Sequence, residues 1–183
     1  FQDASSFNQS LRDWIVSAMA YKFEMLKGTN SLQKDAWPKL IRHDGDIYQA
    51  VNEWCSNRKA AEEKYGHISD WDVSLITNMD NLFRDSEFNS DISNWDVSNV
   101  TSMKYVFISN PVFNQDISNW DVSKVTNMDS MFRNALAFNC DLSSWDVSSV
   151  TYAFGLFANT QNFNCDLSSW DVSNMVNMTG MFE

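Results

Sequence analysis

The sequence predicts an α/β solenoid, a stack of right-handed coils of about 25 residues that each contain a strand, a turn and a helix. Two hydrophobic periods follow one another inside each repeat, and one segment outside the repeats has the pattern of a capping helix. The repeat itself is marked by tryptophans at intervals of 24, 25, 25 and 25 residues: Trp71, Trp95, Trp120, Trp145 and Trp170. A fixed period of this size indicates stacked structural units, and we expect these tryptophans to form a buried ladder.

The first half of each repeat predicts a short strand. In "DISNWDV", Ile117, Trp120 and Val122 follow the L-x-x-L-x-L spacing that is typical of the strand of a leucine-rich repeat. Alternation along a strand places Trp120 and Val122 on one face and Asn119 and Asp121 on the other. The polar residues between the tryptophans are therefore expected to face solvent.

The second half of each repeat predicts a short helix. In "SKVTNMDSMF", Val125, Met128 and Phe132 lie at positions i, i+3 and i+7, which form one stripe of a helix. Ser123 stands at the expected N-cap position. One coil cannot bury these side chains alone, so stacked coils are expected to form columns of Trp, Phe and Met.

A segment before the strongly periodic region predicts a cap for the stack. "DIYQAVNEWCSNRKAAEEKYG" has the pattern of one helix over 46–66 that begins after Asp46 and stops at Gly66. Three residues are expected to share its buried face: Ile47, Val51 and Trp54. A stack of repeats needs such an element over its exposed terminal coil.

The predicted domains follow from these patterns. Trp14 marks a degraded repeat within residues 1–26, which we interpret as the end of a preceding array, and 27–45 is predicted to be a linker. Residues 67–183 are predicted to hold about five repeats. Both chain ends fall at the same phase of the repeat, so we expect a piece of a longer array that is truncated at the C-terminus.

The repeats "ISNWDVSNVTSM" and "ISNWDVSKVTNMDSMF" resemble those of the BspA-like family, leucine-rich-repeat-related surface proteins of bacteria and protists. The resemblance covers 67–182 well and 1–26 weakly. A helix that ends in Tyr-Gly before "ISDWD" is also similar to the segment that opens such arrays. The resemblance implies a leucine-rich-repeat-like fold, a secreted or cell-surface location and a role in adhesion or surface interaction. It transfers no catalytic residue.

Charge and composition restrict the partners. The net charge of −11 resides in 67–183, where four basic residues stand against fifteen acidic ones. Such a surface repels phosphate backbones and anionic lipid, so nucleic acid and electrostatic membrane binding are not expected. No apolar run is long enough for a transmembrane helix.

No pattern predicts an enzyme or a cofactor. The two histidines, His43 and His67, have no second ligand at metal-binding spacing. No Gly-x-Ser-x-Gly elbow and no glycine-rich phosphate loop occurs. We therefore expect a protein without catalytic activity and without a cofactor.

Aspartates recur in two columns. One comprises Asp72, Asp96, Asp121, Asp146 and Asp171, and the other comprises Asp91, Asp116, Asp141 and Asp166. The favoured hypothesis is that each carboxylate accepts hydrogen bonds from N–H groups of the following turn. The alternative is calcium bound at Asp96, Asp121 and Asp146, because Ca²⁺ prefers oxygen ligands.

Two further columns leave alternatives open. Cys140 and Cys165 occupy equivalent positions on adjacent coils, within reach of a disulfide, although parallel side-chain directions favour free, stacked thiols. Single threonines also recur, and a remote alternative is an ice-binding face. Their positions are Thr77, Thr101, Thr126 and Thr151.

The predicted function is that of a non-catalytic scaffold whose solvent-facing residues bind a protein partner or a glycan, as part of a larger protein. The expected interaction face comprises Asn94, Asp96, Asn119, Asp121, Ser144, Asp146, Ser169 and Asp171. Self-assembly into a structural protein and service as an accessory subunit of a large complex are the alternatives. A glycan-active enzyme is a remote one.

Overall fold

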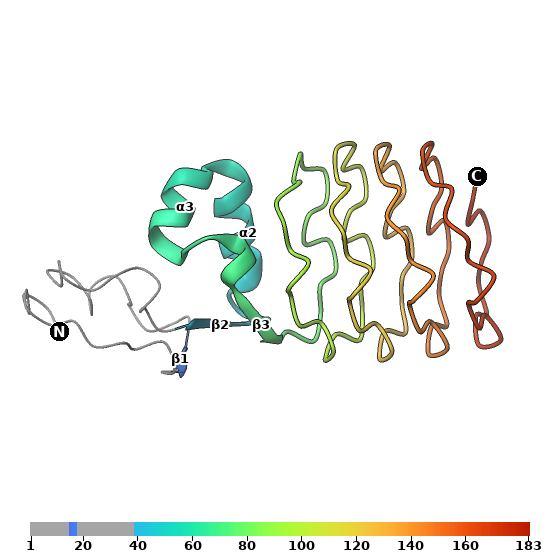
Figure 1. Cartoon of the computed structure of the whole chain (residues 1–183), viewed down its shortest axis with the longest axis horizontal. Helices are drawn as coiled ribbons and strands as arrows, with labels where there is room; N and C mark the ends of the chain where they lie inside the picture. The colour runs from blue at the N-terminus through green and yellow to red at the C-terminus, as the bar shows by residue number, and fades with distance from the viewer. Residues whose placement is uncertain (1–14, 18–38) are drawn as a thin grey trace, which may run out of the picture.

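The computed structural model of the protein describes residues 15–17 and 39–183. In these residues the chain forms a small parallel sheet, a pair of helices and a stack of similar coils. Figure 1 shows the helices at one end of the stack and the coils following one another towards the C-terminus. The rest of the predicted degraded repeat lies outside the described residues.

The sheet contains three parallel strands in the order β1 (Ile15–Ser17), β2 (Lys39–His43) and β3 (Asp72–Leu75). β2 pairs with β3 through Ile41 opposite Asp72 and His43 opposite Leu75, with an irregularity between the two pairs. The sequence predicted a linker over 27–45, and strand β2 corrects this prediction for its last part. The strand was missed because a five-residue element leaves little periodicity to detect.

The predicted single helix over 46–66 is in fact two helices, α2 (Ile47–Ser56) and α3 (Arg58–Tyr65). Asn57 separates them, because its φ of −150° and ψ of 80° are not helical and its side chain accepts a hydrogen bond from the N–H of Ala60 at 3.2 Å. Asparagine favours such capping positions. Gly66 follows α3 with a φ of 77°, which a glycine adopts without strain.

Helix α2 attaches to the stack through its apolar face. The residues expected on that face are all buried: Ile47, Val51 and Trp54. Asp46 precedes the helix as predicted, but its carboxylate makes no capping bond. It accepts instead from Arg42 Nη1 at 2.8 Å and from the N–H of His43 at 2.9 Å. Within the described residues no helix is long and apolar enough to cross a membrane.

The coils stack in parallel register. Isolated bridges join each coil to the next at equivalent positions: Asn78 to Ser102, Ser102 to Asn127, Asn127 to Tyr152, and Tyr152 to Asn177. We call the stretches around these bridges the ladder segments; they are residues 78–85, 102–109, 127–134, 152–159 and 177–183. Alternate N–H groups of one ladder segment donate to carbonyls of the next, as Ser130 does to Phe154 at 2.7 Å and Phe132 to Leu156 at 3.0 Å.

The ladder segments are the stretches that were predicted to be helical, and that prediction is wrong for the described coils, which contain no α-helix after α3. Two residues in each of the first four segments adopt a left-handed conformation that interrupts a helix. In the first four coils these residues are Asn81, Asp85, Tyr105, Ser109, Ser130, Asn134, Gly155 and Asn159. The backbone therefore forms successive tight turns, and its remaining N–H groups bond to the neighbouring coil.

The predicted strand is likewise absent from the later coils. Its residues lie in what we call the turn segments, namely 91–98, 116–123, 141–148 and 166–173. Within one of them the N–H of Trp120 donates to the carbonyl of Ile117 at 3.1 Å. The predicted N-cap Ser123 instead directs its N–H to Asp121 Oδ1 at 3.1 Å. Because these N–H groups are used inside the coil, they do not form a sheet.

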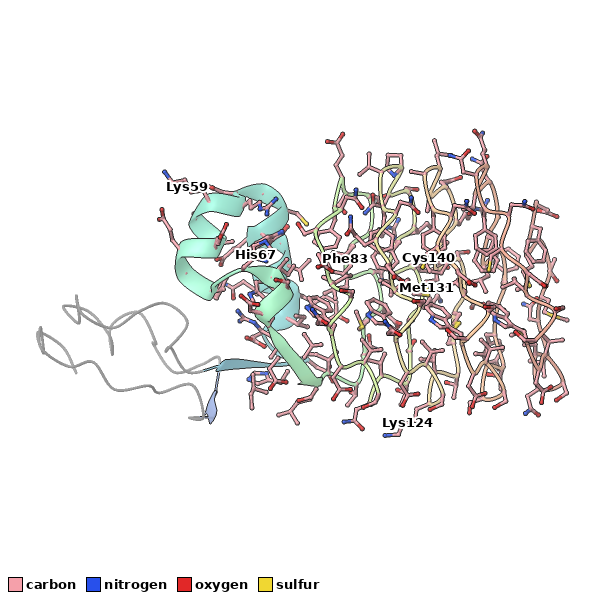
Figure 2. The ribbon with its side chains drawn as sticks, viewed as in Figure 1. Lys59, His67, Phe83, Lys124, Met131 and Cys140 are labelled. Atoms are coloured by element: carbon pink, nitrogen blue, oxygen red, sulfur yellow. The ribbon has the colours of Figure 1, made fainter. Side chains whose placement is uncertain are left out.

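Aromatic columns run through the whole stack. Phe107, Phe132 and Phe157 stack on one another with ring centroids 5.7 and 5.6 Å apart. The five repeated tryptophans are all buried, with exposed fractions of 3 to 8%. Figure 2 shows Phe83 and Met131 inside the stack, whereas Lys124 projects from one margin. The core is therefore continuous from the helices to the last coil.

Candidate interaction surface

Polar side chains at equivalent positions of successive turn segments are exposed and form rows along the stack. The eight residues predicted to form the interaction face are all exposed: Asn94, Asp96, Asn119, Asp121, Ser144, Asp146, Ser169 and Asp171. Each pair flanks a buried tryptophan. The turn, rather than a strand, directs these side chains to solvent, so the predicted exposure holds although the predicted element does not.

Each aspartate of the first column holds the turn that follows it. Asp121 Oδ1 accepts from Ser123 Oγ at 2.6 Å, and Asp146 Oδ1 accepts from the N–H and Oγ of Ser148 at 3.0 and 2.6 Å. Asp96 accepts from the N–H of the serine two residues later at 3.1 Å. This geometry agrees with the turn-capping hypothesis.

Hydrogen bonding outweighs the repulsion along this column. The bonds from Ser148 hold the pKa of Asp146 below its usual value, although the carboxylates of Asp121 and Asp171 above and below act in the opposite direction. The pKa of Asp121 is lowered in the same way by Ser123. These carboxylates are therefore ionised at neutral pH, and the row presents a repeated negative charge.

The second aspartate column repeats the arrangement. Ser118 and Ser143 donate N–H groups to Asp116 and Asp141 at 3.0 and 2.9 Å. Hydrogen bonds from the serines lower the pKa of each carboxyl in this column: Asp91, Asp116, Asp141 and Asp166. Among the described residues, no three His, Cys, Asp or Glu side chains gather closely enough to hold a metal ion. Calcium at Asp96, Asp121 and Asp146 has no further support from the geometry.

The two stacked cysteines lie beside the second column, and both thiols are free, as is that of Cys55. Cys140 Sγ lies 3.4 Å from the N–H nitrogen of Ile117, and Cys165 Sγ lies 3.2 Å from that of Leu142. Each thiol therefore contacts the preceding coil rather than the other thiol. Burial raises the pKa of the Cys140 thiol to about 11.

Some hydroxyls on the surface bind neighbouring coils. Ser144 Oγ donates to the carbonyl of Ser118 at 2.8 Å, which uses part of the expected interaction face for packing. Thr126 Oγ1 donates in the same manner to the carbonyl of Thr101 at 3.1 Å. The threonine hydroxyls thus have an internal role. Asn119 makes no hydrogen bond to another described side chain or carbonyl and leaves its amide to solvent.

Asparagines at equivalent positions of successive coils form a hydrogen-bonded ladder that we did not predict from the sequence. The side chain of Asn114 accepts the N–H of Asn139 at 2.9 Å, and Asn89 accepts the N–H of Asn114 at 3.0 Å. The signal was the asparagine that follows phenylalanine in every "FNxD" repeat. Stacked amides of this kind stabilise the packing of identical repeats.

The junction of helices and coils contains a buried cation. Arg42 lies between the rings of Tyr65 and Trp71, 4.5 and 4.3 Å from their centroids, and pairs with Asp46. Burial lowers the pKa of its guanidinium. His67 accepts the N–H of Ser69 at 3.3 Å. These contacts attach the cap to the first coil and indicate a structural role.

Comparison with known proteins identifies a family. No curated protein and no solved structure matches this chain. One family model matches residues 1–42, 51–154 and 85–183, so that its matches extend over most of the chain and overlap within the repeats. The chain belongs to the family described as Mycoplasma protein of unknown function, DUF285.

Proposed function

We propose that this chain is a non-catalytic scaffold, a leucine-rich-repeat-like solenoid that binds a protein partner through its turn segments. The observation that carries the proposal is the set of exposed, ionised carboxylates held in fixed rows between buried tryptophans. Rigid rows bind a partner without a large loss of conformational entropy.

The partner is expected to be basic or rich in amide groups. Residues 67–183 carry fifteen acidic and four basic residues, and complementary charge accelerates association and excludes acidic partners. Asn94 and Asn119 alternate with the carboxylates and offer amide hydrogen bonds in both directions. The resemblance to BspA-like repeats supports a secreted or cell-surface location and a role in adhesion.

A photo-crosslinking experiment in the source cells tests this function. A benzoylphenylalanine at Asn119 is expected to crosslink one different protein, whereas the same group at Lys59 is not. The double change Asp121→Lys with Asp146→Lys should abolish the crosslink, because it reverses the charge of the row.

The matched control is Glu62→Lys with Glu63→Lys on α3, which alters net charge equally but leaves the turn segments intact. It should retain the crosslink. Crosslinks from Asn119 only to further copies of this chain would overturn the recognition role and support a self-assembling structural protein instead. Loss of the crosslink in both double variants would show that overall charge, rather than the row, attracts the partner.

A further inference from the structure

A groove lies between helix α2 and the first coil. It has a volume of about 560 Å³ and is lined by one side of α2, from Tyr48 to Ser56, and by residues 81–87. We call it the cap groove. It is separate from the polar rows of the turn segments, so the inference below goes beyond the proposed function.

The backbone ladder of the stack begins at this groove. In the second coil, the carbonyls of Lys104 and Val106 accept the N–H groups of Asn81 and Phe83, both at 2.9 Å. Because the coils stack in parallel register, the equivalent carbonyls of the first coil, 24 residues earlier, are expected to point away from the second coil. They belong to Asn78, Asp80, Leu82 and Arg84.

Only the first of these carbonyls is occupied by the cap. The hydroxyl of Tyr48 donates to the carbonyl of Asn78 at 3.3 Å, and this contact shows that the first carbonyl of the row faces α2. The carbonyls of Asp80, Leu82 and Arg84 accept no hydrogen bond from another described residue. Leu82 and Arg84 line the groove, and Asp80 precedes them in the same row, so these acceptors continue the register that joins the described coils.

We propose that the cap groove binds a peptide segment of a partner protein, which adds its N–H groups to this row. Three carbonyls that accept from alternate residues need a segment of about five residues. The segment takes the conformation of the ladder itself, in which the donors Asn81 and Asp85 have positive φ. Asparagine, aspartate or glycine at the first and fifth positions of the segment suits that conformation, because the two residues with positive φ are four apart.

The negative charge at one end of the groove favours a peptide with a basic residue at that end. Asp85 pairs with Arg84 at 2.8 Å, but Glu87 is exposed and forms no ion pair with another described residue. A basic residue at this end of the peptide would pair with Glu87. Tyr48 and Val51 line the side formed by α2, where small or apolar peptide side chains fit.

A synthetic peptide tests the proposal directly. The fluorescein-labelled peptide "TNMDNLFRDS", residues 77–86, carries the donors that join the first coil to the second. Fluorescence anisotropy with the complete chain should show saturable binding. Methylation of the peptide nitrogen at its phenylalanine removes one donor and should weaken binding about tenfold. Equal binding of the methylated and unmethylated peptides would overturn the proposal.

Two tryptophan variants locate the binding. Asn52→Trp fills the groove and should weaken binding at least about tenfold, whereas Lys59→Trp should leave it unchanged. Figure 2 shows Lys59 on the helices at a distance from the coils. If Asn52→Trp fails to fold by circular dichroism, Ser56→Trp replaces it, because Ser56 lines the same groove. No saturable binding, or equal binding by the groove variant and the control, would contradict the proposal.

Discussion

Trp145 donates its indole N–H to the main-chain carbonyl of Ile117, 3.1 Å away in the preceding coil. The same bond recurs along the stack, from Trp95 to Ile68, from Trp120 to Ile92 and from Trp170 to Leu142. Each of these tryptophans therefore fills the core and gives a second donor to a carbonyl of the preceding coil, which already accepts a main-chain N–H. This double role explains why a tryptophan, and no other aromatic residue, recurs at this position.

We predict that Trp145→Phe lowers the free energy of unfolding by about 2–4 kcal/mol. The carbonyl of Ile117 keeps the main-chain N–H of Trp120 but loses the indole donor in a buried site, and the smaller ring leaves a cavity. Urea unfolding followed by circular dichroism measures the effect. Phe157→Leu is the control, because it shrinks a buried ring without removing a donor; a loss no larger than that of the control would contradict the role of the hydrogen bond.

The second prediction concerns Gly155, which has a φ of 58° and donates its N–H to the next coil. An added Cβ would lie 3.2 Å from Ser130 Oγ. Gly155→Ala should therefore lower the free energy of unfolding by about 1–2 kcal/mol, and by more if Ser130 cannot shift. Thermal and urea unfolding measure the change.

Removal of Ser130 Oγ provides the control for Gly155→Ala. In a Ser130→Ala background the added Cβ no longer meets the hydroxyl oxygen 3.2 Å away, while the φ of 58° is the same. The excess loss of stability from Gly155→Ala in the unaltered background isolates the contact with Ser130. Equal losses in the two backgrounds would show that backbone conformation alone accounts for the cost.

The sequence predicted the period, the buried tryptophans and the exposed rows, because these depend only on hydrophobic spacing. It did not predict the ladder segments. Val125, Met128 and Phe132 fit a helical stripe, yet successive turns place the same side chains in the core. The ladder segments differ from a helix in two residues with left-handed conformation, four apart, such as Ser130 and Asn134. Serine and asparagine also occur on exposed helix faces, so these residue types did not reveal the turns in the sequence.

The turn segments show a similar limit. The role of each aspartate in holding a turn was predictable, since Asp followed two residues later by Ser favours such turns. The loss of the strand was not, because the alternation around Trp120 fits both a strand and a turn. Local hydrogen bonds to the carboxylate compete with the sheet, and in these coils they prevail.

The third prediction follows from the lowered pKa values of the turn carboxylates. A carboxyl whose pKa is lower in the folded chain stabilises the fold when ionised, and this contribution is lost as pH falls through the folded pKa. The free energy of unfolding should therefore fall as the pH drops below about 4, the ordinary pKa of aspartate. Urea unfolding at a series of pH values measures the slope.

Asp121→Asn tests whether a turn carboxylate carries part of that slope. Asparagine retains an oxygen that accepts from Ser123 but has no proton to bind, so the dependence on pH should become shallower. Glu63→Gln, an exposed change on α3 outside the turns, is the control. An unchanged slope in Asp121→Asn would show that other groups govern acid unfolding.

The last prediction concerns the thiols. Alkylation of the unfolded chain without reductant should add three labels, because the thiols of Cys140 and Cys165 each contact the preceding coil and are free. In the native chain, Cys140 should react far more slowly than the exposed Cys55. Its pKa of about 11 leaves roughly a thousandth of the thiol ionised at pH 8, and its side chain is buried. Mass spectrometry of the labelled peptides distinguishes the sites. A single label, on Cys55 alone, would establish a disulfide between Cys140 and Cys165 and contradict the stacked, reduced arrangement.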